Sequence, residues 1–463
     1  MTQTAPGTPR RTRRTASSRT APHQPLTSAE IAARYLAFFR ARDHREIAGS
    51  SLVLPGNSTS FVIAGMQPLL PYLRGQEPPP APRLTALQLC LRTDDAEAVG
   101  RNGRKLTSFH MLGNWSIGDY GKREAITLAR ALLDEFGIAR DGYWVTTFAG
   151  DAALGLPPDA ETVAEWRRAG MPAERIVPLG MDDNFWPAGG WAGPCGPCSE
   201  IFVDRGAALG CGRPTCQPGC SCERFLEIWN LVFIEYDQSA DGRFAPLPLR
   251  SVDTGMGLER MAAVLQGAAT VFETDLFAPA RRRLAELAPV EPDGEGERRV
   301  RARRVIVDHT RAALFAGLAG VRPGRDGRAS VVRRLIRRAA RQGRLLGLEG
   351  PFLAELAEPI LEGHAGLVAE GAREQLPALA GMVREEEEQF ARVLTSGLRR
   401  LARLAPDGRG LVAGEQVFAL HADRGFPADL AGEVLAERGL AVDWAGYEAA
   451  LARHQEVSRA SME

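Results

Sequence analysis

Apolar and polar side chains alternate along three short segments in the first half of the chain, which is the period of β-strands with one buried face. The segments are 84–92, 107–115 and 225–236, and turns rich in glycine and proline separate them. A helix is predicted ahead of them, because Thr27 and Glu30 have the spacing of a capping box and apolar residues then recur at helical intervals. This order predicts an α+β fold in which helices flank an antiparallel sheet.

The chain becomes almost wholly helical after the Pro-, Glu- and Gly-rich stretch 289–297. The formal net charge is zero, yet residues 298–344 contain fifteen arginines and only two acids. A helix predicted at 331–344 has one apolar face and one face of arginines, namely Arg333, Arg334, Arg337, Arg338, Arg341 and Arg344. Because this face repels itself, we expect it to bind a phosphate backbone, and pairing with acids elsewhere in the chain is the alternative.

Neither end of the chain has the pattern of a membrane or secretory segment. No apolar run approaches the roughly 20 residues of a membrane helix, so a cytoplasmic location is predicted. Residues 1–25 contain five arginines, no acid and hardly any large apolar side chain. We predict a disordered basic tail there, which either solubilises the protein or contacts phosphates.

Six of the seven cysteines lie between positions 195 and 222, whereas a disulfide-stapled secreted protein would spread them more widely. Four of them fall within twelve residues, at Cys211, Cys216, Cys220 and Cys222. Four thiolates are a ligand set typical of structural Zn²⁺, so we predict zinc, with a reduced cysteine-rich loop as the alternative. The spacing of Cys195 and Cys198 is interpreted as incidental.

The apolar segment 225–236 carries a lone amide. Strict alternation puts its even-numbered residues on one face, namely Leu226, Ile228, Asn230, Val232 and Ile234. Asn230 and Val232 are therefore candidates to hold the polar end of a small substrate and to shape a cavity for its methyl group. A core amide with satisfied hydrogen bonds is the alternative for Asn230.

A glycine-rich turn follows at 251–260, with the sequence SVDTGMGLER. Gly255 and Gly257 permit a ligand to approach the backbone at a helix start, where free N–H groups favour phosphate. Asp253 is a candidate ligand for an ammonium group, and Arg260 is a candidate for binding nucleotide phosphates or for stacking on the base.

Four blocks stand in the order and spacing of a known family: AGM at 64–66, MLGNWSIGDY at 111–120, NFW with GPCGPCSEIFVD within 184–204, and EIWNLVF at 227–233 with SVDTGMGLER at 251–260. In these strings the chain resembles the alanyl-tRNA synthetases, which are class II synthetases. Its helical half is similar to their tRNA-recognition region at 304–315 and 331–347.

The resemblance implies a class II catalytic domain with a Cys-rich insertion at 26–278 and a helical tRNA-recognition-like domain at 279–463. It also implies ATP and Mg²⁺ as cofactors and L-alanine as substrate. Arg92 would then bridge the amino-acid carboxylate and the ATP α-phosphate, Trp186 would touch the carboxylate and Asp253 would bind the ammonium. Asn230 and Val232 would line the alanine pocket, Met66 would lie beside it as part of the alanine-binding set, and Arg92, Gly255, Gly257 and Arg260 would bind ATP.

The chain departs from the family on the tRNA side. The stretch after Arg92 lacks the family's lysine, and Arg325 and Ala422 stand where an asparagine and an aspartate read the acceptor-stem G·U pair. Asp423 is interpreted as a reader shifted by one residue. We therefore expect RNA contacts from Arg325, Arg333, Arg334, Arg337, Arg338, Arg341 and Asp423. No histidine pair has the editing-site spacing, so we expect a short form without editing and C-terminal domains.

The leading prediction is an enzyme that makes alanyl-adenylate from alanine and ATP and transfers the alanyl group to tRNA(Ala). The alternative is a paralogue that transfers alanine to a small molecule or carrier in a biosynthetic or resistance role. A catalytically idle RNA-binding protein is a third hypothesis, but the complete set of Arg92, Asn230, Asp253 and Arg260 argues against it.

Overall fold

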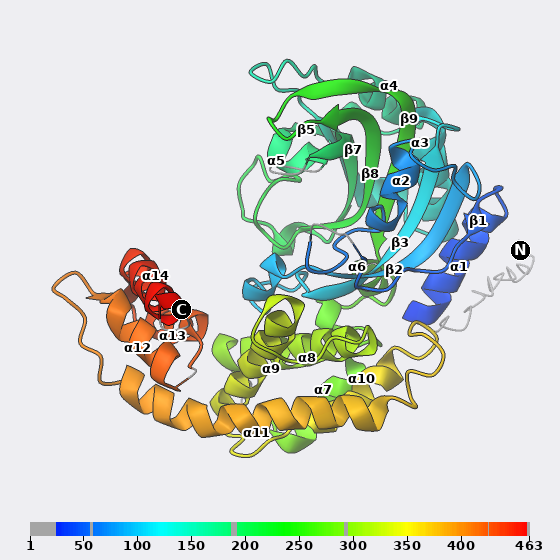
Figure 1. Cartoon of the computed structure of the whole chain (residues 1–463). Helices are drawn as coiled ribbons and strands as arrows, with labels where there is room; N and C mark the ends of the chain where they lie inside the picture. Colours follow the sequence, from blue (N-terminus) through cyan, green and yellow to red (C-terminus); the bar gives the residue numbers. More distant parts are fainter. Residues whose placement is uncertain (1–24, 56–58, 187–191, 291–294, 425, 461–463) are drawn as a thin grey trace, which may run out of the picture.

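The structure is a computed structural model, and it describes residues 25–55, 59–186, 192–290, 295–424 and 426–460. The predicted tail at 1–25 lies outside the described residues except for its last position. A large sheet with its covering helices occupies the first part of the described chain, and a group of helices lies beneath it (Figure 1). No helix among the described residues is long and apolar enough to span a bilayer. The cytoplasmic location stays a prediction.

The sheet has the strand order β1-β2-β3-β9-β8-β7-β4-β5, with β6 paired to β7. Its strands are β1 (Arg45–Glu46), β2 (Arg83–Leu91), β3 (Ser108–Ile117), β4 (Tyr143–Phe148), β5 (Ile176–Leu179), β6 (Phe185–Trp186), β7 (Gly193–Asp204), β8 (Phe225–Gln238) and β9 (Phe244–Gly257). The three segments with alternating side chains are β2, β3 and β8. The central pairs are antiparallel as predicted, whereas β1 with β2 and β4 with β5 are parallel, so the sheet is mixed.

Helices cover one face of this sheet. They are α1 (Ser28–Arg40), α3 (Lys122–Glu135), α4 (Ala160–Arg168) and α6 (Leu258–Leu265), and the short α2 (Leu70–Leu73) and α5 (Met181–Asn184) lie in the connections. The predicted capping box is present, because the Thr27 hydroxyl accepts from the Glu30 amide and the Glu30 carboxylate accepts from the Thr27 amide. α1 then packs its apolar side chains into a core with β8, which includes Tyr35 and Trp229.

The remaining helices are α7 (Ala278–Leu287), α8 (Glu297–Leu318), α9 (Gly327–Leu345), α10 (Ala357–Gly363), α11 (Leu376–Leu401), α12 (Gly414–Arg424), α13 (Ala428–Ala436) and α14 (Trp444–Ala460). The long α11 runs from the group around α8 to the smaller group α12–α14 (Figure 1). This part is almost wholly helical, as predicted, and the two-residue strands β10 (Leu411–Val412) and β11 (Ala441–Val442) pair in parallel within it.

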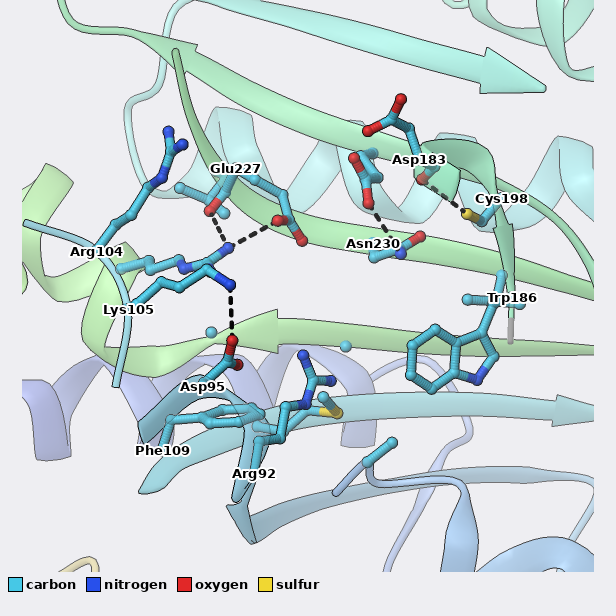
Figure 2. Close-up of a pocket in the computed structure, with 18 of the residues that line it drawn as sticks. Arg92, Asp95, Arg104, Lys105, Phe109, Asp183, Trp186, Cys198, Glu227 and Asn230 are labelled. Carbon is cyan, nitrogen blue, oxygen red and sulfur yellow. Dashed lines mark hydrogen bonds and ion pairs between the residues drawn. The ribbon is translucent and has the colours of Figure 1, made fainter. Parts of the chain in front are cut away.

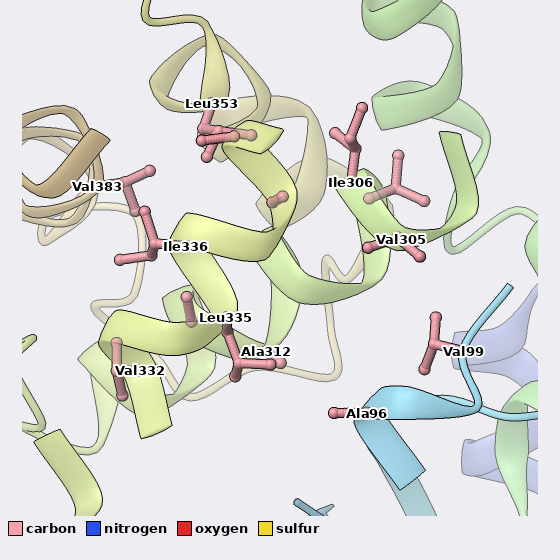
Figure 3. Close-up of a cluster of buried hydrophobic side chains, with 14 of the residues drawn as sticks. Ala96, Val99, Val305, Ile306, Ala312, Val332, Leu335, Ile336, Leu353 and Val383 are labelled. Atoms are coloured by element: carbon pink, nitrogen blue, oxygen red, sulfur yellow. The ribbon is translucent and has the colours of Figure 1, made fainter. Parts of the chain in front are cut away.

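The two parts of the fold meet at the loop between β2 and β3. Figure 3 shows Ala96 and Val99 of this loop beside Val305 of α8, and all three belong to the core that also holds α9. Next to this core, the Thr107 amide donates to the Asp308 carboxylate of α8 at 3.0 Å. The hairpin that carries Arg92 is therefore fixed from below by the helical part.

A buried polar network joins α6, β3 and α8 at the same junction. Glu259 accepts hydrogen bonds from the His110 amide and from Arg311, and the His364 Nε2 atom lies 3.3 Å from Arg311 Nη1. Burial alone raises the pKa of Glu259, but its hydrogen bond with His110 and the Arg311 charge outweigh it and lower the pKa to about 2. Burial and the Arg311 charge hold the pKa of His364 well below its usual value. The ion pair at this junction is thus enclosed, although the Arg311 Nε atom has no hydrogen-bond partner among the described residues.

Candidate active site

A cavity of about 240 Å³ opens on the face of the sheet away from α1, where β3, β9 and β8 lie side by side. Figure 2 shows Arg104 and Lys105 at one side of it, Asn230 at the other, and Arg92 between Phe109 and Trp186. Its lining includes the predicted residues Arg92, Trp186, Asn230, Val232, Asp253, Gly255, Gly257 and Arg260. The fold thus gathers residues that lie up to 168 positions apart in the sequence.

A β-bulge on β8 decides which of its side chains reach the cavity. Ile201 of β7 stands opposite Trp229 while Phe202 stands opposite Glu227, so Ile228 is an extra residue in the pairing. Glu227 therefore lies on the cavity side together with Asn230, and Leu226 packs into the core against the helices. The prediction that Leu226 shares the face of Asn230 is wrong, because strict alternation does not survive a bulge.

Asp253 lies at the floor of the cavity, directly opposite Val232 in the pairing of β8 and β9. Its carboxylate Oδ1 accepts a hydrogen bond of 2.6 Å from the Trp115 indole nitrogen. Burial raises the pKa of Asp253 to about 7, although the Trp115 hydrogen bond works in the opposite direction. A cation placed here restores the ionised carboxylate, so the site favours an ammonium group.

Asn230 is held by a neighbouring carboxyl group. Its Nδ2 atom donates to Glu200 Oε1 at 3.3 Å, while its Oδ1 atom is buried and has no hydrogen-bond partner among the described residues. Burial, followed by the nearby Glu227 charge, raises the pKa of Glu200 well above its usual value. Asn230 is therefore not the fully satisfied core amide of the alternative, since its Oδ1 acceptor has no partner among the described residues.

The opposite end of the cavity is cationic. Arg260 Nη1 lies 2.8 Å from Glu227 Oε2 and 3.1 Å from the Glu227 carbonyl oxygen. Lys105 Nζ lies 2.7 Å from Asp95 Oδ1, and Arg104 donates to two backbone carbonyls beyond the cavity wall. Arg92 Nε donates to the Ile63 carbonyl at 3.0 Å. Arg104, Lys105 and Arg260 thus line one end and Arg92 lies between that end and Trp186, so a polyphosphate finds charge-assisted donors there.

Sequence reasoning did not single out several charged residues of the lining, among them Arg104, Lys105, Glu200 and Glu227. The two cations lie shortly before β3, at the far end of the hairpin loop that begins after Arg92. A signal was present, because the two ends of a hairpin loop lie close together in space. The two glutamates stand within quoted family strings, but only the register shift and its bulge show that both reach the cavity.

Met66 lies behind the wall of the cavity. It is fully buried, and the Trp186 indole nitrogen lies 3.2 Å from its sulfur atom. It packs in one core with Val232, while Met111 and Ala64 are among the residues that line the cavity itself. Met66 therefore supports the ring of Trp186 from behind, and a direct role in alanine binding stays a prediction.

The two glycines of the turn differ in what their lack of a side chain permits. A Cβ atom at Gly255 would lie 2.8 Å from the Met111 sulfur, so packing of the protein itself requires this glycine. A Cβ atom at Gly257 would meet only the Arg260 side chain, at 3.5 Å or more. Gly257 leaves open backbone at the start of α6, as a ligand site there needs.

Residues 30–463 match the family described as tRNA synthetases class II (A). The chain belongs to the class II alanyl-tRNA synthetase family. It is 45% identical to the alanine--tRNA ligase of Desulforudis audaxviator over 449 residues, which cover 94% of this chain and 49% of that protein. It is 44% identical to the alanine--tRNA ligase of Rubrobacter xylanophilus, with 95% and 50% covered. The chain therefore spans about half the length of the curated relatives it matches.

Solved structures with similar folds are more distant. Apo S. aureus histidyl-tRNA synthetase is 11% identical, with 51% of this chain and 69% of that chain covered and a TM-score of 0.32. A pyrrolysyl-tRNA synthetase from Desulfitobacterium hafniense is 13% identical over 55% of this chain and 74% of that chain, with a TM-score of 0.31.

The cysteine-rich insertion lies between β7 and β8, at the predicted place. The sulfur atoms of Cys211, Cys216 and Cys220 all lie within 4.8 Å of one another, and the Cys216 and Cys222 sulfurs are 3.7 Å apart. Two sulfur ligands of tetrahedral zinc are about 3.8 Å apart, given Zn–S bonds of about 2.3 Å. A hydrogen bond from Arg213 lowers the pKa of Cys211 to about 6. The donor set and spacing fit a zinc ion.

Acids of the same chain neutralise much of the arginine face of α9, which was the alternative to phosphate binding. Arg337 Nε lies 2.6 Å from Glu386 Oε1 of α11, and Arg338 and Arg341 pair with Glu433 and Glu437 of the α13 region at 2.8 and 2.6 Å. The exposed fractions of Arg337, Arg338 and Arg341 are only 5%, 5% and 4%. The prediction that these three arginines bind phosphate is therefore wrong, because glutamates of the same chain neutralise their charges inside the fold.

The other predicted RNA contacts differ in their surroundings. Arg333 lies 3.4 Å from Glu386, and Arg334 is half-buried on the same helix. Arg325 is exposed in the turn before α9, and Asp423 stands on α12. The reading of an acceptor stem by Arg325 and Asp423 stays a prediction.

Proposed function

We propose that this chain activates L-alanine with ATP to form alanyl-adenylate and transfers the alanyl group to tRNA(Ala). The observation that supports it best is the polarity of one cavity, with the buried carboxylate of Asp253 at one end and the cations of Arg260, Arg104 and Lys105 at the other. Such an arrangement suits a small zwitterion and a polyphosphate laid end to end.

Alanine is proposed to bind with its ammonium on Asp253 and the Oδ1 atom of Asn230. The unpartnered acceptor of Asn230 and the raised pKa of Asp253 both favour a cation there. Val232, which packs with Ala64 and Trp115, would contact the methyl group. A wall of this size gives only modest discrimination against glycine or serine, since one methylene group is worth about 1–3 kcal/mol.

In the activation step, a carboxylate oxygen of alanine attacks the α-phosphorus of ATP. The bond from that phosphorus to the oxygen bridging to the β-phosphate breaks, and pyrophosphate leaves. Arg92 lies between Phe109 and Trp186, with its guanidinium 4.9 and 5.8 Å from the two ring centroids. We assign it the bridge between the alanine carboxylate and the α-phosphate, because a planar guanidinium spreads over both anions.

Arg260, Arg104 and Lys105 are proposed to neutralise the pyrophosphate as it leaves. Mg²⁺ prefers carboxylate oxygens and phosphates, and the carboxylates of Glu227 and Glu200 line this same cavity. They are the residues that would hold it, and when bound it supplies further charge neutralisation on the phosphates. The residues of the chain do the rest by positioning and electrostatics, with no covalent enzyme intermediate.

The acceptor is proposed to enter beside Arg92 and Trp186. A second cavity of about 430 Å³ shares these two residues and Asp95 with the first, so it opens onto the place where the adenylate would form. Residues 26–278 would then perform the chemistry, and residues 279–463 would orient the RNA. We further propose that Cys211, Cys216, Cys220 and Cys222 hold a structural Zn²⁺ ion.

The rival function, transfer of alanine to an acceptor that is not tRNA, is favoured by one observation. Most of the arginine face on α9 is occupied by glutamates of the same chain, which removes one expected RNA contact surface.

Charging of a tRNA(Ala) transcript with labelled alanine tests the proposal. We expect stable alanyl-tRNA to form, together with alanine-dependent exchange of pyrophosphate into ATP. Exchange without detectable charging would favour the rival acceptor, and absence of both would contradict the proposed activity altogether.

A further inference from the structure

A third cavity, of about 590 Å³, lies on the other side of the β2–β3 loop from the active-site cavity. Residues 101–103 of the loop line it, and the next two residues, Arg104 and Lys105, line the active site. Its other walls come from the end of α6, the start of α8 and the segment after β7. The two cavities therefore share a single stretch of loop as their partition.

Three arginines line this cavity, against one glutamate. Arg101 comes from the loop, Arg304 from α8 and Arg205 from the segment after β7, and Glu223 is the acid. Arg205 lies 4.0 Å from Glu223 and also donates to the Ala269 carbonyl. Arg101 and Arg304 make neither an ion pair nor a hydrogen bond through their side chains with any residue in the part of the chain that the structure describes. The cavity thus carries an excess of unpaired positive charge.

A neighbouring arginine adds to this excess. Arg301 lies one helical turn before Arg304, and its Nε atom is buried without a hydrogen-bond partner among the described residues. Burial, together with the like charge of Arg101, lowers the pKa of Arg301, and burial lowers the pKa of Arg304. Each guanidinium still remains charged at neutral pH, so this cluster costs free energy unless an anion joins it.

The contrast with α9 sets this cluster apart. On α9 the arginines meet Glu386, Glu433 and Glu437 within the fold, whereas Arg101 and Arg304 meet no such partner. The floor below them is apolar, formed by Leu226, Ala263 and Val264. Cations at the rim and an aliphatic floor suit a nucleotide unit, with its phosphate at the guanidinium groups and its sugar or base against the floor.

We propose that this cavity binds a phosphate group of the RNA acceptor, with Arg101 and Arg304 as its principal donors. The proposal rests on the proposed function, because it presumes that the acceptor is RNA. It also places the contact with the RNA backbone at residues 101–105 of the β2–β3 loop instead of the arginine face of α9. A phosphate held there biases residues 101–105, and so couples RNA binding to the phosphate end of the active site.

The test is the binding of an RNA minihelix that carries the tRNA(Ala) acceptor stem and its single-stranded 3′ end. Arg101→Ala/Arg304→Ala should weaken binding about tenfold at about 0.1 M salt and lower the slope of log K against log salt by about 2. Arg101→Lys/Arg304→Lys should retain most of the slope because it keeps both charges. The matched control is Arg34→Ala/Arg123→Ala, which removes two exposed arginines from α1 and α3.

Equal loss of binding in the control pair and the cavity pair would overturn the proposal, since it would mean that only total charge matters. A free nucleotide offers the same phosphate and sugar groups as RNA, so binding of free AMP is measured as well. If AMP binding but not minihelix binding depends on Arg101 and Arg304, the cavity takes a free nucleotide and the proposal fails.

Pyrophosphate exchange separates failure of this proposal from failure of the proposed function. Neither arginine lines the active-site cavity, so alanine-dependent exchange by the double variant should equal that of the wild type. A wild-type protein that exchanges pyrophosphate but binds no minihelix would contradict RNA as the acceptor. Tight minihelix binding that is unchanged in Arg101→Ala/Arg304→Ala would overturn the proposal for this cavity, but not the proposed function.

Discussion

Glu227 and Arg260 form a close ion pair within the active-site cavity, with 2.8 Å between Oε2 and Nη1. The pair exists because the bulge at Ile228 turns Glu227 to the cavity side of β8, where it meets the first turn of α6. Arg260 Nη1 also donates to the Glu227 carbonyl oxygen, so both its position and its direction are set by this one residue. A guanidinium held in this way is preorganised for a phosphate group.

Glu227→Gln should therefore impair the use of ATP more than that of alanine. A hydrogen bond to a charged group is worth about 1.5–3 kcal/mol, so we expect kcat/KM for ATP in pyrophosphate exchange to fall at least tenfold. KM for alanine should change less than about threefold. Glu174→Gln, at an exposed glutamate outside the cavity, is the control. Equal effects on both substrates would contradict a role at the phosphate end.

Alanine binding should weaken as the pH falls through about 7. Burial raises the pKa of Asp253 to about 7, so below that pH the carboxyl group holds a proton and offers no charge to the ammonium. The apparent Kd for alanine should rise about tenfold per pH unit at full effect, and be constant above about pH 8. Calorimetric titration between pH 6 and 8.5 measures it.

Two variants show whether Asp253 or Glu200 causes this pH dependence. Asp253→Asn should bind alanine weakly at every pH and lose the dependence. Glu200→Gln should retain it, although the pKa of Glu200 is also raised by burial. A pH profile that follows Glu200 instead would show that the ammonium contacts a different carboxylate. The same raised pKa means that Asp253 contributes less to folding stability as the pH rises from about 4 to 7, because the native carboxyl group retains its proton.

The acids that face α9 should be structural. Glu433→Gln/Glu437→Gln leaves the guanidinium groups of Arg338 and Arg341 without their nearest partners, although these groups are only 6% and 5% exposed. We expect a loss of about 1–2 kcal/mol in unfolding free energy per substitution, below the value for a fully buried pair because the acids are partly exposed. Urea denaturation measures it.

Glu415→Gln is the matched control for this loss. It breaks the ion pair with Arg453, whose side chains are 59% and 71% exposed, so its effect should be close to zero. Unchanged stability of the double variant, together with much tighter RNA binding, would restore the arginine face as a phosphate site.

Purified protein should contain about one tightly bound zinc ion per chain. The sulfur atoms of Cys211, Cys216 and Cys220 already lie within 4.8 Å of one another, so little rearrangement is needed. Cys216→Ser should lose the metal and lower the thermal midpoint, while Cys90→Ala should retain the metal. Elemental analysis measures the zinc content, and less than about half an equivalent of zinc per chain in wild-type protein would contradict the proposed zinc site.

The sequence predicts much of this fold because local signals agree with the tertiary structure. Thr27 and Glu30 begin α1 through their own side chains, and alternation along 84–92 and 107–115 matches β2 and β3. The candidate site was also accessible where a residue lies on a regular strand or at a helix start, as Asn230, Asp253 and Arg260 do.

What could not be predicted depends on long-range partners. The position of Glu227 follows from the register of β7 against β8. The charges of Arg337, Arg338 and Arg341 are neutralised by glutamates 49 to 96 residues away in the chain. The contact of Met66 with Trp186 likewise depends on a residue 120 positions away in the chain. Periodicity reports the face of a helix, but it does not report what that face meets.

The most direct test of the central claim, that one cavity joins alanine to ATP, is alanine-dependent exchange of labelled pyrophosphate into ATP. The account predicts exchange by the wild type and by Asp241→Ala, an exposed carboxylate outside the cavity. It predicts a loss of at least a hundredfold in kcat/KM for alanine with Asp253→Ala, since a charged hydrogen-bonding partner is removed from a buried site. Wild-type protein that shows no exchange with alanine, or undiminished exchange by Asp253→Ala, would contradict it.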